Sequence, residues 1–144
     1  MNEVNMQKEL VLNNYAIGFL KETAKWSFFM SVTGFIGIAF MVVVGLFMGT
    51  IFSSLPNTES LPFGGALMTF IYLLIAILYF FPMLYLYRFS IKMKASLVRN
   101  DEEELVEAFS NLKSHYKFVG ILTIVMLSFY AIMLLFGLAA ALMV

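Results

Sequence analysis

The chain has 144 residues, of which 62% are hydrophobic and only 12% are charged. A soluble domain is about 45–50% apolar and roughly 25% charged, and a water-soluble fold of this size could not bury so much apolar surface. The composition therefore excludes a soluble enzyme, a disordered tail and a nucleic-acid binder, and it indicates an integral membrane protein. Nine basic side chains balance nine acidic ones, so the net charge gives no information about partners.

The N-terminal segment 9–24 carries apolar residues at helical spacing, among them Leu12, Tyr15, Phe19 and Leu20. An apolar stripe of this kind is typical of an amphipathic helix that lies at a membrane surface. We therefore expect a separate interfacial helix before the first membrane span.

Three later stretches contain no Asp, Glu, Lys, Arg or His, namely residues 26–52, 62–87 and 118–144. Each is longer than the roughly 20 residues that a helix needs to cross the hydrocarbon core, and far longer than a buried strand. The first is also too long for the apolar part of a cleavable signal peptide. The sequence therefore predicts an all-α integral membrane protein, a single membrane domain over 1–144 with three transmembrane helices.

The basic residues are segregated along the chain. Three precede residue 26, six lie within 88–117, and none lies in the loop 53–61 or after Lys117. Because Lys and Arg concentrate in cytoplasmic segments, this distribution predicts a cytoplasmic N-terminus and an outside C-terminus. The segment 88–117 is then also cytoplasmic.

Within 88–117 we expect a helical hairpin that joins the second and third spans. Residues 88–99 continue the second span as a basic amphipathic helix, and Asn100 or Asp101 offers an N-cap for the next helix. One face of that helix is apolar and is formed by Leu105, Ala108, Phe109, Leu112 and Tyr116. The acidic residues that begin it fit the positive end of a helix dipole better than a metal site.

The first span carries a face of small residues at helical spacing: Ser27, Ser31, Gly34, Gly45 and Gly49. Small residues let helix backbones approach closely in lipid, where van der Waals contact drives helix association. Two alternatives are open, packing against another span of the same chain and packing between copies in a homo-oligomer. We favour the first, because a GxxxG pair such as Gly45 and Gly49 is a weak motif on its own.

Two further groups of residues mark the second span and the inner membrane boundary. Pro82 lies inside the second span and is predicted to kink it, because proline has no N–H to donate to the preceding turn. Aromatic and basic side chains suited to anchoring helices at the headgroups are Lys25, Trp26, Tyr85, Tyr87, Arg88, Tyr116 and Lys117.

Residues that could carry chemistry are scarce. There is no cysteine and one histidine, His115, and no ionisable side chain lies within a span. We find no paired carboxylates, metal ligands or activated nucleophile, so the sequence predicts no enzyme activity, no cofactor and no metal site. His115 falls at headgroup level, where a bystander role is favoured over pH sensing or contact with lipid phosphate.

Residues 20–46 and 112–138 share the patterns LKxxxK and AxMxxxGL at an offset of 92. Both stretches enter the membrane from the same side in the predicted topology, so they are either parallel repeats or chance similarities between apolar helices.

The motifs LKETAKW (20–26), YFFP (79–82) and NLKSHYKF (111–118) resemble a family of small bacterial membrane proteins known only as a domain of unknown function. The resemblance covers about residues 15–135. It implies a bacterial inner membrane, and it implies that Pro82 and His115 belong to a shared pattern. It implies no activity, substrate or cofactor.

Two functional hypotheses follow. The first is a non-catalytic interaction or accessory subunit of the inner membrane, with membrane lipids and another membrane protein as partners. The second is a small channel or carrier formed by homo-oligomers, because three spans cannot enclose a pore alone. Such oligomers would use the face of Gly34, Gly45 and Gly49. No nucleic-acid partner is expected.

Overall fold

The structure, a computed structural model, describes residues 13–55 and 64–142. Within these ranges the chain forms three helices, α1 (Asn14–Ser53), α2 (Gly64–Arg99) and α3 (Glu102–Leu142), and no strand. Each helix is long and apolar enough to cross a membrane. The predicted all-helical fold with three helices of membrane-spanning length is therefore confirmed.

The prediction of a separate interfacial helix over 9–24 is wrong for the residues that the structure describes, and residues 9–12 lie outside them. α1 begins after Asn13, whose side-chain oxygen accepts a hydrogen bond from the Ala16 N–H at 2.8 Å, and it runs unbroken into the first apolar stretch. The segment LKETAKW holds no glycine or proline, so nothing in it ends a helix. Its Ala24 is fully buried, which shows that this turn packs against protein.

A tight turn at Asn100 and Asp101 separates α2 from α3. Asn100 adopts a left-handed conformation with φ 51°, and the Asp101 N–H donates to the Ser96 carbonyl at 3.2 Å, which together close the end of α2. The Asp101 carboxylate then accepts from the N–H groups of Glu103 and Glu104 at 3.0 and 3.3 Å. Asp101 is thus the N-cap of α3. The segment expected as a hairpin consists of the ends of two long helices.

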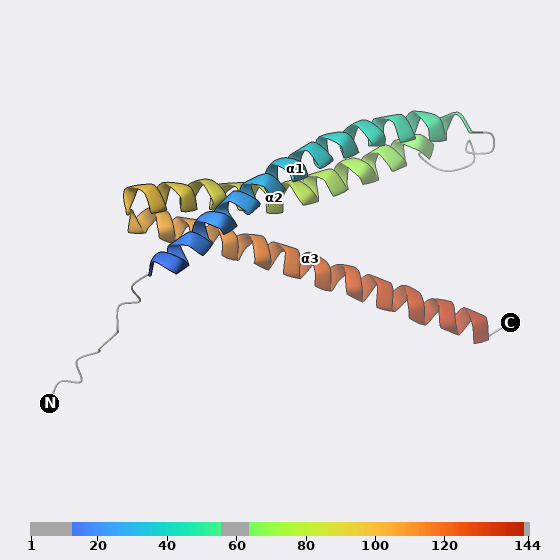
Figure 1. The fold of residues 1–144 in the computed structure, drawn as a ribbon. Coiled ribbons are helices and arrows are strands. Elements are labelled where there is room, and N and C mark those ends of the chain that lie inside the picture. Colours follow the sequence, from blue (N-terminus) through green and yellow to red (C-terminus); the bar gives the residue numbers. More distant parts are fainter. Residues whose placement is uncertain (1–12, 56–63, 143–144) are drawn as a thin grey trace.

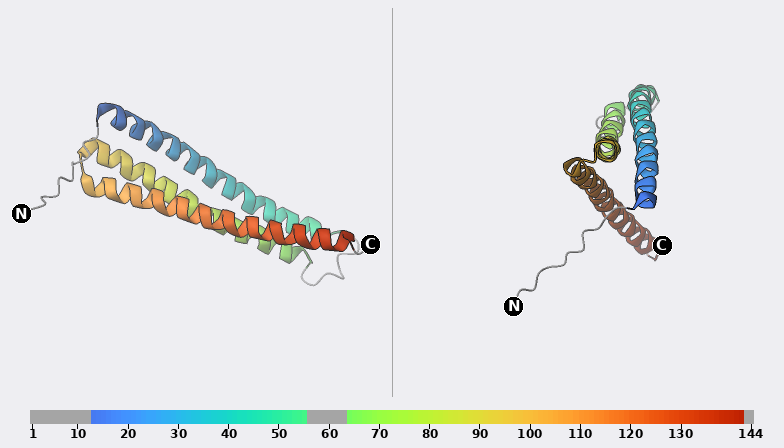
Figure 2. Two further views of the ribbon diagram at one scale, coloured as in Figure 1. Left: turned by 90° about the horizontal axis from the view of Figure 1, so that it is seen from below. Right: turned by 60° about the vertical axis from the view of Figure 1, so that its left-hand side comes forward.

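α2 lies between the other two helices and packs against both, whereas no Cα atom of α1 comes within 8 Å of one in α3 in the described part. Figure 1 shows the second half of α1 beside the first half of α2, and the start of α3 beside the end of α2 before α3 diverges. Figure 2 shows the same three helices from two further directions. The buried apolar core lies near the α2–α3 turn and consists of Ala24, Leu86, Phe89, Met93 and Ala108.

Within the described residues, the far part of α3 has no neighbouring helix. Apart from the partly exposed Leu122, every residue from Val119 to Ala139 is exposed. A Cβ atom added at Gly120 or Gly137 would meet nothing within 4 Å. α3 is therefore held by α2 at one end only and diverges from α1 and α2 along its apolar length.

Candidate functional site

The small-residue face of α1 packs against α2 of the same chain. A Cβ added at Gly45 would lie 2.6 Å from the Tyr72 Cβ, so only glycine permits this approach. A Cβ at Gly49 would collide with the Thr69 hydroxyl and would lie 3.0 Å from the Gly65 carbonyl oxygen. The Thr69 hydroxyl also donates to the Gly45 carbonyl at 3.2 Å. Close backbone approach and an interhelical hydrogen bond thus hold this end of the α1–α2 pair together.

The remaining small residues of that face lie nearer the core. Ser27 and Ser31 are buried, and the Ser31 hydroxyl donates to the Phe28 carbonyl of its own helix at 2.8 Å. A Cβ at Gly34 would collide with the Met83 side chain of α2. The α1 face that sequence analysis assigned to helix packing is therefore occupied within the chain.

Two hydrogen bonds that the sequence did not indicate join the helices around the core. The Ser90 hydroxyl of α2 donates to the Ala24 carbonyl of α1 at 2.6 Å, and both residues are buried. On the other side of α2, His115 Nδ1 lies 2.8 Å from the Pro82 carbonyl oxygen. A carbonyl can only accept, so Nδ1 carries the proton and Nε2 remains available. Polar side chains thus connect each outer helix to α2.

Pro82 is buried inside the unbroken helix α2. It lacks the N–H that would bond the carbonyl four residues earlier, so the helix is weakened at this point. The kink predicted there stays a prediction. The hydrogen bond from His115 of α3 is accepted by the carbonyl group of this same residue of α2.

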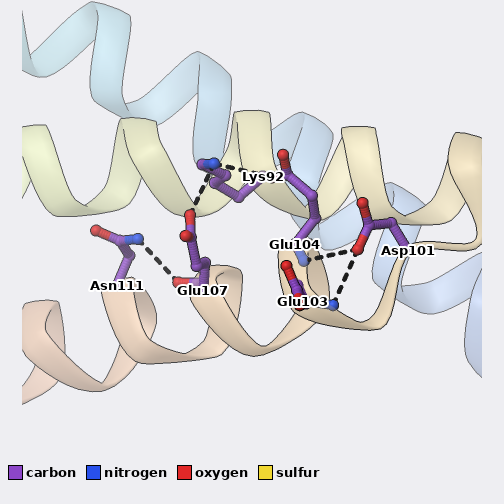
Figure 3. A network of polar contacts seen from close by, with 6 residues as sticks. All are labelled: Lys92, Asp101, Glu103, Glu104, Glu107 and Asn111. Carbon is purple, nitrogen blue, oxygen red and sulfur yellow. Dashed lines mark hydrogen bonds and ion pairs between the residues drawn. The ribbon is translucent and has the colours of Figure 1, made fainter.

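A three-residue ion-pair cluster links α2 to the first turns of α3 (Figure 3). Lys92 Nζ lies 2.7 Å from a Glu107 carboxylate oxygen and 3.0 Å from a Glu104 oxygen. The hydrogen bond to Glu107, followed by that to Glu104, raises the pKa of Lys92 above its ordinary value of 10.5. The Glu104 oxygen is buried and has no other polar partner in the described part. The cluster therefore fastens the α2–α3 turn, and it lies beyond the apolar part of α2.

A groove of about 530 Å³ opens between α1 and α3 at the level of His115. Glu22, Thr23 and Trp26 line its α1 wall, and Tyr116 lies on the α3 wall beside His115. The sequence did not indicate this groove, because its walls are brought together only through α2. The groove therefore combines a cavity with several polar side chains.

The residues predicted as interface anchors occupy different surroundings. Trp26 and Tyr116 are 59% and 67% exposed, and Lys25, Arg88 and Lys117 are also exposed. Tyr85 and Tyr87 are partly buried in the helix pair. Tyr87 packs on the rings of Phe28 and Phe35 of α1, with ring centroids 5.8 and 6.1 Å apart. The position of these side chains relative to a bilayer stays a prediction.

No group of three or more His, Cys, Asp or Glu suited to a metal ion occurs in the described residues. The described residues offer helix-packing surfaces, an amphipathic groove and an ion-pair cluster.

Comparison with known proteins gives a family. The model described as "Family of unknown function (DUF5362)" matches residues 64–138, which include both Pro82 and His115. Neither a curated protein nor a solved structure matches the chain. The predicted resemblance to an uncharacterised family is confirmed, because the match covers more than half of the chain: this protein belongs to the DUF5362 family of unknown function.

Proposed function

We propose that this protein is a non-catalytic accessory subunit of an inner-membrane complex, and that the apolar part of α3 binds its partner. The exposure of α3 supports this proposal, because no residue of its most apolar window is buried in the described structure. A helix held at one end and free along its length offers another membrane protein a long surface for van der Waals contact. α1 and α2, by contrast, already pack against each other.

A channel or carrier built from several copies is the second candidate. The sequence suggested that copies would associate through Gly34, Gly45 and Gly49, but these glycines face α2 of the same chain. We propose that copies would instead associate through the apolar part of α3, of which no residue is buried in the described structure. The exposure of α3 favours association of copies through α3 over association through the glycine face. Both candidate functions can therefore be tested with probes placed on α3.

Site-specific photo-crosslinking in native membranes tests the proposal. A photoreactive amino acid is placed at Leu127 or Leu134 of α3, whose side chains are 62% and 63% exposed. The matched control position is Phe40 of α1, which is 69% exposed. We expect both α3 positions, and not Phe40, to give one discrete adduct with a different membrane protein, identified by mass spectrometry.

Other outcomes separate the candidates. An adduct between two copies of this chain from the α3 positions supports the oligomeric channel or carrier. Lipid adducts alone at all three positions contradict both candidates, because they show that α3 faces only the bilayer.

A further inference from the structure

The groove between α1 and α3 is open because the two helices pass each other without backbone contact. Its walls come from α1 and α3, and Leu86 of α2 lies between them. Figure 1 shows the N-terminal half of α1 passing across α3 in this region. In the predicted topology this level corresponds to the inner headgroups, with Trp26 and Tyr116 in the walls. In that topology a membrane lipid reaches the groove from the surrounding bilayer.

The groove changes character along its length. Glu22, Thr23 and His115 are among its polar members, together with Ser27 and Tyr116, whereas Met30 and Leu86 are apolar. Met30 follows Thr23 by two helical turns, a separation of about 10 Å along α1. A ligand that fills the groove must combine a polar head with an apolar chain, as a phospholipid does.

Three polar residues of the groove, Glu22, Thr23 and His115, present hydrogen-bond acceptors, and Trp26, Ser27 and Tyr116 add groups that can donate. The Thr23 hydroxyl gives its proton to the Phe19 carbonyl at 2.8 Å, which leaves its oxygen as an acceptor. His115 Nδ1 is engaged with the Pro82 carbonyl, so in the tautomer that carries its proton on Nδ1 the other ring nitrogen, Nε2, is an acceptor. The Glu22 carboxylate can only accept, and no basic side chain of the described residues forms an ion pair with it.

Three acceptors, one of them anionic, match a primary ammonium group, which has three N–H donors and a positive charge. We propose that the groove binds phosphatidylethanolamine, with the ammonium against Glu22, Thr23 and His115 and an acyl chain along Met30 and Leu86.

The charges next to the groove complement the rest of this headgroup. Lys21 and Lys25 flank Glu22 on α1 and line an adjoining hollow that shares Glu22 and Trp26 with the groove. In the proposed complex these two cations are the partners for the lipid phosphate. A choline headgroup has no N–H to donate, and phosphatidylglycerol has no cation for Glu22, so both fit the groove less well.

Native mass spectrometry of the purified full chain tests this proposal. The protein is exchanged into detergent with equal amounts of phosphatidylethanolamine, phosphatidylcholine and phosphatidylglycerol that carry identical acyl chains. We expect the retained lipid to be predominantly phosphatidylethanolamine. Equal retention of the ethanolamine and choline lipids, or a preference for phosphatidylglycerol, overturns the proposal, and neither result depends on a variant.

Two substitutions then assign the contacts. Glu22→Gln removes the charge and is expected to lower phosphatidylethanolamine retention about tenfold, the effect of one charge-assisted hydrogen bond. His115→Asn keeps an amide donor near the position of Nδ1 for the Pro82 carbonyl but removes the Nε2 acceptor, and it should also lower retention. The matched control is Glu103→Gln, which makes the same change from carboxylate to carboxamide at an exposed position in the first turn of α3.

Circular dichroism separates lost binding from lost fold. If Glu22→Gln and Glu103→Gln retain the lipid equally well while both remain helical, Glu22 does not bind the headgroup and the proposal fails. A selective loss in Glu22→Gln supports it. The outcome is independent of the proposed accessory role, because the groove and the exposed part of α3 are tested by different residues.

Discussion

His115 donates a hydrogen bond from Nδ1 to the backbone carbonyl of Pro82 on the neighbouring helix, over 2.8 Å. The contact joins the motifs YFFP and NLKSHYKF, and both lie in the part of the chain that the family model matches. It stands at the place where α3 begins to diverge from α2. The imidazole therefore has a structural partner, although sequence reasoning favoured an interfacial bystander.

Loss of this hydrogen bond should weaken the attachment of α3. We expect His115→Leu to lower the free energy of unfolding by about 1 kcal/mol, because a partly buried carbonyl loses its side-chain donor. His115→Asn, which retains a donor, should remain within a few tenths of the parent. Equilibrium unfolding in mixed micelles, followed by circular dichroism, measures the difference. Equal stability of the leucine and asparagine variants would show that the bond is energetically neutral.

The close approach of α1 and α2 predicts opposite effects for two glycines of the same helix. Gly45→Ala places a Cβ 2.6 Å from the Tyr72 Cβ and should destabilise the helix pair by about 1–3 kcal/mol. Gly37→Ala adds its Cβ to open space, and it should stabilise α1 by up to about 1 kcal/mol because alanine is the better helix former. Thermal unfolding in detergent measures both. A stable Gly45→Ala variant would contradict the observed packing.

The Lys92 cluster predicts a pH dependence with a defined sign. Its carboxylate partners raise the pKa of Lys92 in the folded state above 10.5, so the ion pairs stabilise the fold fully below that pH. The stabilisation is lost as the pH rises through the raised pKa. Lys92→Met should therefore unfold at a lower temperature than the parent near pH 7, and the two should converge above pH 10.5.

Lys113→Met is the control for this experiment, since Lys113 is exposed and has no ion pair in the described structure. It should match the parent across the same range. A difference between Lys92→Met and the parent that persists unchanged in strong alkali would mean that Lys92 acts through packing of its alkyl chain.

The long apolar runs and the turn at Asn100 and Asp101 were predictable because they depend on local physics. The length of each apolar run follows from the absence of charge, and an Asp that precedes three glutamates has few roles other than an N-cap. The prediction of a separate interfacial helix before Trp26 was wrong because the pattern does not identify what covers the apolar face. An amphipathic stripe indicates one covered face, but it does not tell whether lipid or another helix covers it.

The contacts between helices could not be predicted, because they depend on how far each helix is rotated and shifted against α2. Ser90 and Ala24 are 66 residues apart, and nothing local marks either as a partner. The two sequence stretches at an offset of 92 illustrate the limit. Leu20 and Leu112 both pack on the same core, yet Gly45 contacts Tyr72 whereas Gly137 meets nothing. Identical residues at matching positions of the two stretches can thus have different structural environments.

The segregation of basic residues predicts an orientation that single cysteines can test, since the natural chain has none. Ser54→Cys follows the end of α1, Ser110→Cys lies near the α2–α3 turn, and Ser128→Cys lies in the apolar part of α3; all three positions are exposed. A membrane-impermeant maleimide added to intact cells should label Ser54→Cys only. After permeabilisation it should also label Ser110→Cys, while Ser128→Cys stays protected by lipid or a partner. Labelling of Ser110→Cys and not Ser54→Cys in intact cells would reverse the orientation, and the Lys and Arg asymmetry would then need another cause.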